Sequence, residues 1–93
     1  MKGVHFYEGA WRNDPPMVAG PMDLGFWSAN NVFDGARAIH GCAPDLDRHC
    51  ARLIRSAKAI GLEPAMTAEE VHALCVEGIR MLPADADYYV RPM

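Results

Sequence analysis

Two consecutive amphipathic helix patterns, each with its own start and stop signals, fill much of the second half of the chain and most constrain its fold. In the first, Asp45 or Asp47 is a candidate N-cap, and Gly61 followed by Pro64 predicts the end. Between these signals, apolar residues recur at helical spacing: Leu46, Cys50, Leu53, Ile54, Ala57 and Ile60. This pattern predicts a helix with one buried face.

The second helix pattern begins at a capping box and ends at a proline. Between Thr67 and Glu70, the threonine hydroxyl and the glutamate carboxylate can satisfy backbone N–H groups that the first helical turn leaves free. Pro83 predicts the end of this helix. The predicted buried stripe is Val71, Leu74, Cys75, Gly78, Ile79 and Leu82.

Short β-prone segments flank the two helices. Residues 4–12 predict a small hairpin, residues 31–39 a second strand, and residues 88–91 a last strand. Proline and glycine make residues 13–25 a loop. The order of strands, two helices and a strand predicts a single α+β domain with both helices on one face of a small sheet.

Composition limits the function classes that the chain can serve. The 93 residues, 51% apolar and 23% charged, are typical of one small soluble domain. A net charge of −3 without a basic stripe argues against nucleic-acid binding. No apolar run approaches the roughly 18 residues of a membrane-spanning helix. The three cysteines lack framework spacing, and no His or Cys pair has zinc-site spacing, so we expect reduced thiols, a cytoplasmic protein and no metal.

One β-prone segment carries candidate binding residues. In a strand, alternation places Phe33, Gly35 and Arg37 on one face, with Asp34 and Ala36 on the other. An aromatic ring, a glycine and an arginine on one face describe a pocket wall. An edge strand with a solvated arginine explains the same pattern.

Two further groups have equally open interpretations. Tyr89 and Arg91 share one strand face, where they could hold a carboxylate or simply be half exposed. Arg48, Arg52 and Arg55 form a cationic strip on one flank of the first helix. Arginine binds phosphate well, but a solvated helix face also explains the strip, and periodicity does not separate Arg52 from the other two.

Taken in order and at their spacing, three segments resemble the class IV aminotransferases that use pyridoxal 5'-phosphate (PLP), in particular the branched-chain amino acid type. The segments are Val32 to Arg37, His49 to Ala57 and Tyr89 to Pro92. They are similar to that family's Val-Phe-Glu-Gly-x-Arg strand, His…Arg-Leu…Ser-Ala helix and Tyr-x-Arg-Pro strand. The likeness covers residues 3–93 and implies the N-terminal small domain of fold-type IV PLP enzymes.

The resemblance also implies roles for matching residues. Arg52 matches the arginine that binds the PLP phosphate. Residues of the two strand segments match those near the substrate: Phe33, Gly35, Arg37, Tyr89 and Arg91. The implied reaction is amino transfer between a branched-chain-like amino acid and a 2-keto acid, in a homodimer.

What the chain lacks is as informative as what it contains. Enzymes of this kind hold PLP as a Schiff base on a lysine, and neither Lys2 nor Lys58 stands at the family's position. We therefore expect residues 1–93 to be the N-terminal domain of a longer enzyme, truncated, with no catalytic residue of its own and inactive alone. Asp34 replaces the family's usual glutamate, which leaves the substrate preference open.

Two other functions stay open on the sequence. Without the lysine, the chain could be a stand-alone, non-catalytic remnant or interaction domain. It could equally belong to a related class IV enzyme: a PLP-dependent lyase, a D-amino acid aminotransferase or an amine transaminase.

Overall fold

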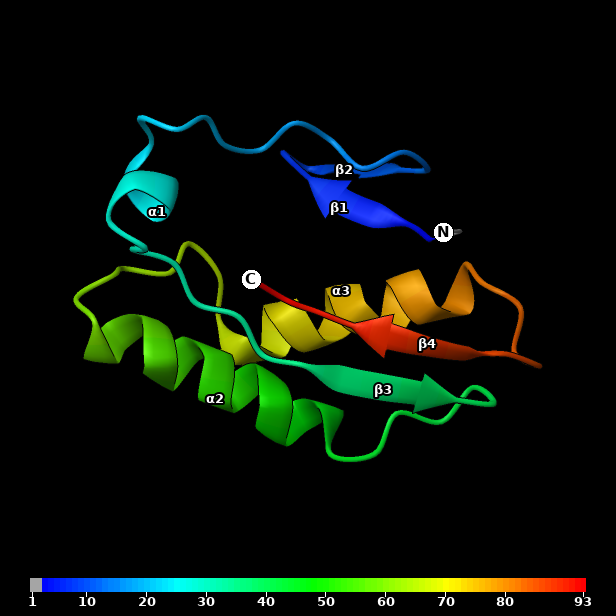
Figure 1. Cartoon of the computed structure of the whole chain (residues 1–93). Helices are drawn as coiled ribbons and strands as arrows, with labels where there is room; N and C mark the ends of the chain where they lie inside the picture. The colour runs from blue at the N-terminus through cyan, green and yellow to red at the C-terminus, as the bar shows by residue number, and fades with distance from the viewer. Residues whose placement is uncertain (1–2) are drawn as a thin grey trace.

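Two separate two-stranded antiparallel sheets and three helices make up the computed structural model, which describes residues 3–93 (Figure 1). Lys2 therefore lies outside the described residues. In chain order the elements are β1 (His5–Tyr7), β2 (Ala10–Arg12), α1 (Leu24–Trp27), β3 (Ala36–Ile39), α2 (Leu46–Ala59), α3 (Ala68–Arg80) and β4 (Asp87–Val90).

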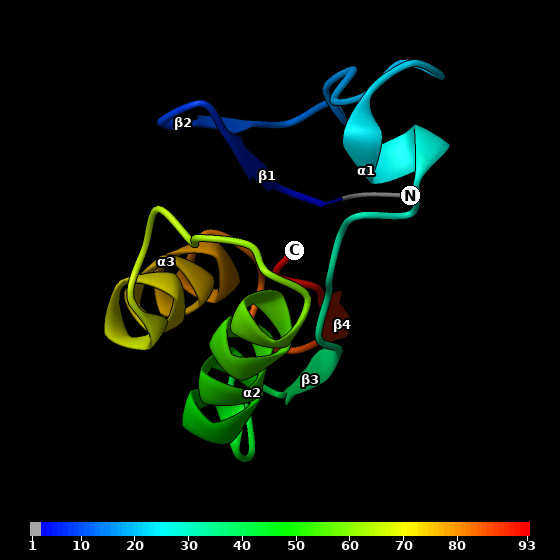
Figure 2. The ribbon, with the colours of Figure 1, turned by 90° about the vertical axis from the view of Figure 1, so that its left-hand side faces the viewer.

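The two long helices pack side by side against one face of the β3–β4 sheet (Figures 1 and 2). This confirms the predicted α+β class, with both helices on one face of a small sheet. The buried centre is Ala36, Leu46 and Cys50, against which partly buried residues of α3 and β4 pack: Val71, Cys75, Val76, Ile79 and Val90. Burial raises the pKa of the Cys50 thiol to about 12, so this cysteine behaves as a small apolar core residue.

Helix boundaries follow the local signals closely. Thr67 caps α3, with its hydroxyl accepting from the Glu70 N–H at 3.2 Å and the Glu70 carboxylate accepting from the Thr67 N–H at 3.1 Å. Asp45 is the N-cap of α2, but its backbone is left-handed and its side chain makes no capping bond. Ile60 was predicted in the buried stripe of α2 and is instead 48% exposed, because it lies at the C-cap beyond the last helical residue.

The predictions outside the two long helices need three corrections. β1 and β2 form a sheet of their own, so the predicted single sheet is two. The strand predicted for residues 31–39 begins only at Ala36, where pairing with Val90 starts. The next partner, Pro92, accepts one bond from the Asp34 N–H at 3.1 Å but has no N–H to return, so regular pairing cannot continue. Finally, the predicted loop 13–25 runs into the single helical turn α1, which is too short to show a periodic pattern.

The β1–β2 hairpin lies on α3, where Trp11 makes a close side-chain contact. The Trp11 ring covers Gly78 so closely that a Cβ there would overlap it, and the Trp11 indole N–H donates to Glu77 Oε1 at 3.1 Å. Phe6 packs edge-on against Trp11, with ring centroids 5.4 Å apart. Gly78 is thus the point at which the N-terminal hairpin meets the helical layer.

Candidate functional site

A buried carboxylate ties the segment before β3 to helix α2. Asp34 is only 5% exposed and accepts three hydrogen bonds. His49 Nδ1 donates at 2.7 Å, Arg52 Nε at 2.6 Å and Arg52 Nη2 at 2.8 Å. His49 and Arg52 are three residues apart and therefore lie on one flank of α2. The arginine grips the carboxylate with two parallel N–H groups, which is the strongest geometry for such a pair.

Proton positions in this cluster follow from what each group can donate. An ionised carboxylate only accepts, so His49 Nδ1 must carry the proton that it shares with Asp34. Arg52 Nη2 lies 3.4 Å from the same nitrogen, but two donors cannot bond to each other, so this approach is not a hydrogen bond. The hydrogen bonds of the His49 and Arg52 side chains thus meet at Asp34, and none joins the two side chains directly.

The arginine keeps donors for a further partner. Of the five N–H groups of a guanidinium, Asp34 takes one on Nε and one on Nη2, which leaves three. The Arg52 side chain is 59% exposed although its carboxylate partner is buried. Arg52 is therefore a cation fixed in place by Asp34, and its unused N–H groups can bind a second anion from the solvent side.

The charges of this pair are permanent at physiological pH. The Arg52 hydrogen bonds, with help from His49, lower the Asp34 pKa from 3.8 to about 2, although burial acts in the opposite direction. The same contact raises the pKa of Arg52 further above its ordinary value. Both groups stay ionised throughout the neutral range.

The low pKa of Asp34 predicts an acid-sensitive contribution to stability. Because the folded-state pKa is depressed, this contribution is present above pH about 4 and is lost as the pH falls toward about 2. We expect Asp34→Asn to unfold at a lower temperature than the wild type at pH 5 and the difference to shrink by pH 2. Thermal unfolding followed by circular dichroism across this range tests it, with the exposed Asp85→Asn as control. If the unfolding temperatures of Asp34→Asn and the wild type differed by the same amount at every pH, the low pKa of Asp34 would be contradicted.

The five residues proposed to lie near the substrate come together on the opposite face of the same segment. In the β3–β4 pair, Arg37 stands directly opposite Tyr89. The Arg91 guanidinium lies over the Phe33 ring, 4.2 Å from its centroid, and also approaches the Tyr89 ring and hydroxyl, at 5.3 and 3.4 Å. The predicted alternation is therefore correct, and this face carries two arginines beside aromatic rings.

Gly35 makes the closest contact on this face. A Cβ at Gly35 would overlap the Tyr89 hydroxyl, so a side chain at this position would displace the tyrosine. Phe33 and Tyr89 are 52% and 58% exposed, which leaves the aromatic face open to solvent. Gly35 thus lets the tyrosine hydroxyl lie against the backbone.

The remaining arginines of the cationic strip differ from Arg52. Arg48 and Arg55 are exposed, and neither takes part in the ion pairs found within residues 3–93. For these two, the solvated-face interpretation agrees with the structure. The sequence assigned no role to Asp34 or His49. Two signals could have located them: the alternation that points Asp34 away from Phe33, and the three-residue spacing of His49 and Arg52.

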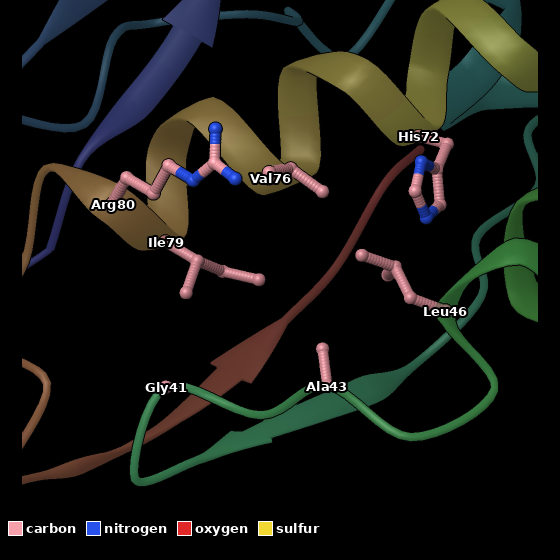
Figure 3. A pocket seen from close by; sticks show the side chains of 7 residues that line it. All are labelled: Gly41, Ala43, Leu46, His72, Val76, Ile79 and Arg80. Carbon is pink, nitrogen blue, oxygen red and sulfur yellow. The ribbon is translucent and has the colours of Figure 1, made fainter.

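A separate small pocket lies between α3 and the loop that joins β3 to α2 (Figure 3). Its volume is about 210 Å³, and it is lined by Gly41, Ala43, Leu46, His72, Val76, Ile79 and Arg80. None of the candidate binding residues lines it. Within residues 3–93, no cluster of metal-ligating side chains was found, and no helix has the length and apolar character needed to cross a bilayer.

The family of the chain follows from its sequence match. The model of the amino-transferase class IV family matches residues 31–93, which include both the Asp34 cluster and the aromatic face. The chain therefore belongs to the class IV aminotransferase family, as the resemblance of its three motifs predicted.

Individual relatives agree with this assignment. Probable branched-chain-amino-acid aminotransferases of Rickettsia bellii and Rickettsia felis are each 34% identical over 68 residues, which are 70% of this chain and 22% of those proteins. An aminotransferase from Brucella abortus, solved with the cofactor PLP bound, superposes with a TM-score of 0.92 at 41% identity. A branched-chain aminotransferase from Thermoproteus uzoniensis, solved with norvaline, superposes with a TM-score of 0.86 at 28% sequence identity. Each of these two matches covers 98% of this chain and 32% of the solved one.

Proposed function

We propose that residues 1–93 are the N-terminal domain of a longer PLP-dependent aminotransferase that moves an amino group between a branched-chain-like amino acid and a 2-keto acid. The chain spans 22% of the length of the curated relatives and 32% of the solved structures that it matches. The observation that carries the proposal is the fixed, half-exposed Arg52 guanidinium, which occurs in a chain 41% identical to an aminotransferase solved with PLP. We further propose a homodimer located in the cytoplasm.

The residues present fit the phosphate end of PLP. Arg52 offers three unused N–H groups on a guanidinium whose position Asp34 sets, and phosphate accepts such bonds readily. When bound, PLP would supply the electron sink that amino transfer requires. The covalent attachment of PLP is proposed to use a lysine outside residues 1–93, because neither Lys2 nor Lys58 stands where the family places its lysine.

The aromatic face is proposed to hold the substrate side chain. Phe33 and the Tyr89 ring can contact an apolar side chain, whereas Arg37, Arg91 and the Tyr89 hydroxyl can hold a carboxylate. One face could thus admit first a branched-chain amino acid and then the side-chain carboxylate of glutamate or its keto acid. Gly35 gives the Tyr89 hydroxyl its place against the backbone on this face.

The proposal is tested on the native polypeptide. We expect an intact mass several times 10.2 kDa, the absorbance of bound PLP, and glutamate formation from leucine and 2-oxoglutarate. A mass near 10.2 kDa without PLP absorbance would favour the stand-alone interaction domain instead. Product formed from aminodeoxychorismate without a keto acid would indicate the lyase. Turnover of D-alanine would indicate a D-amino acid aminotransferase, and turnover of an (R)-amine would indicate an amine transaminase.

A further inference from the structure

The Asp34 cluster has a feature that phosphate binding by Arg52 alone does not explain. A single exposed arginine on a helix would be enough to attract a phosphate, yet here the arginine is tied to an acid that is 5% exposed. Burying a carboxylate is costly unless it is paired and hydrogen-bonded. The three hydrogen bonds to Asp34 meet this requirement, and they place a buried, paired charge directly behind the proposed phosphate ligand.

The geometry shows what this carboxylate does to the arginine. Its two oxygens accept parallel hydrogen bonds from Arg52 Nε and Nη2, at 2.6 and 2.8 Å. One of these oxygens also accepts a hydrogen bond from His49 Nδ1, at 2.7 Å. Two contacts to one rigid carboxylate fix both the position and the plane of the guanidinium. The third contact, from His49, holds the carboxylate itself.

Asp34 is also held from its own backbone. Its N–H donates to the Pro92 carbonyl at 3.1 Å, directly beyond β4, and the neighbouring Ala36 is buried in the core. The acid therefore sits on an anchored segment, whereas Arg52 has a long and largely exposed side chain. In such a pair the short, anchored partner sets the position of the long one.

We propose that Asp34 is a positioning residue which orients the Arg52 guanidinium toward the phosphate of PLP, with the hydrogen bond from His49 holding the carboxylate in place. This inference rests on the proposed function, and it explains how the chain holds Arg52 in position to bind the phosphate. Asparagine cannot replace the acid, because three donors converge on Asp34 and an amide would present its own N–H groups to one of them. Glutamate keeps the charge and both acceptor oxygens.

The test measures cofactor binding in the complete enzyme with two probes, PLP and pyridoxal, which lacks the phosphate. For Asp34→Asn we expect the dissociation constant for PLP to rise about tenfold while that for pyridoxal changes by less than about twofold. A merely structural role would weaken both ligands equally, and that result would overturn the inference. The exposed Asp47→Asn, on the first turn of α2, is the matched control and should bind both probes as the wild type does.

Two further variants keep the test decisive if Asp34→Asn folds poorly. Asp34→Glu should keep the wild-type ratio of the dissociation constant for pyridoxal to that for PLP. A ratio as low as that of Arg52→Ala would overturn the inference. In an Arg52→Ala background, Asp34→Asn should change PLP affinity by less than about twofold, because its effect acts through the arginine. Independent, additive losses would also overturn it. A wild-type enzyme that binds neither probe would overturn the proposed function together with this inference.

Discussion

Arg52→Ala in the complete enzyme is expected to raise the dissociation constant for PLP by roughly 10- to 100-fold, as the loss of one or two charge-assisted hydrogen bonds predicts. The substitution removes the three N–H groups that Asp34 leaves free for a phosphate. Arg52→Lys should recover only part of this affinity, because an ammonium cannot bind Asp34 with two parallel N–H groups. Equilibrium dialysis against PLP gives the affinities, and an unchanged dissociation constant for Arg52→Ala would refute the role of Arg52.

Stability must be separated from binding in this experiment. Arg52→Ala also leaves the buried Asp34 carboxylate with one partner fewer, so the variant is expected to unfold at a lower temperature. The double variant Asp34→Ala/Arg52→Ala removes the buried charge as well and should regain thermal stability without regaining PLP affinity. Arg55→Ala, on the same helix and exposed, controls for the loss of a positive charge. Recovery of PLP affinity in the double variant would show that Arg52 acts through folding alone.

The helices could be predicted from the sequence because their signals are local. The capping box of Thr67 and Glu70 lies within four consecutive residues, and the structure contains both of its hydrogen bonds. The start of β3 could not be predicted, since it depends on Pro92, a partner 56 or more residues away along the chain. The division into two sheets could not be predicted either, because the placement of the hairpin depends on contacts between residues far apart in the chain, such as Trp11 with Gly78.

The same distinction separates the two halves of the candidate site. Strand alternation correctly grouped Phe33, Gly35 and Arg37, because side-chain direction in extended backbone is a local property. The pairing of Asp34 with His49 and Arg52 spans 15 and 18 residues and depends on how α2 packs on the β3–β4 sheet. Periodicity therefore could not single out Arg52 from its exposed neighbours. Only the family resemblance did so, and it gave no role to the acid behind it.

Gly35→Ala is expected to lower kcat/KM for the amino donor by roughly 10- to 100-fold while leaving PLP affinity unchanged. The new Cβ would overlap the Tyr89 hydroxyl and lie 3.1 Å from the ring carbon that carries it. Because Tyr89 is 58% exposed, it can swing toward solvent, so the fold should survive while the aromatic face is rearranged. A displacement of about 1 Å of such a positioning group can cost about 100-fold in rate. Steady-state kinetics with leucine and 2-oxoglutarate measures the loss.

Two comparisons connect this loss to the Tyr89 contact. Gly20→Ala, whose Cβ would have its nearest neighbour at 3.7 Å, should behave as the wild type. Tyr89→Phe removes the atom that the new Cβ overlaps most, so the double variant Gly35→Ala/Tyr89→Phe should lose less activity than the two single losses combined. Additive losses would mean that Gly35 acts through backbone conformation instead. A less-than-additive loss would show that Gly35 maintains the arrangement of the aromatic face by leaving room for the Tyr89 hydroxyl against the backbone.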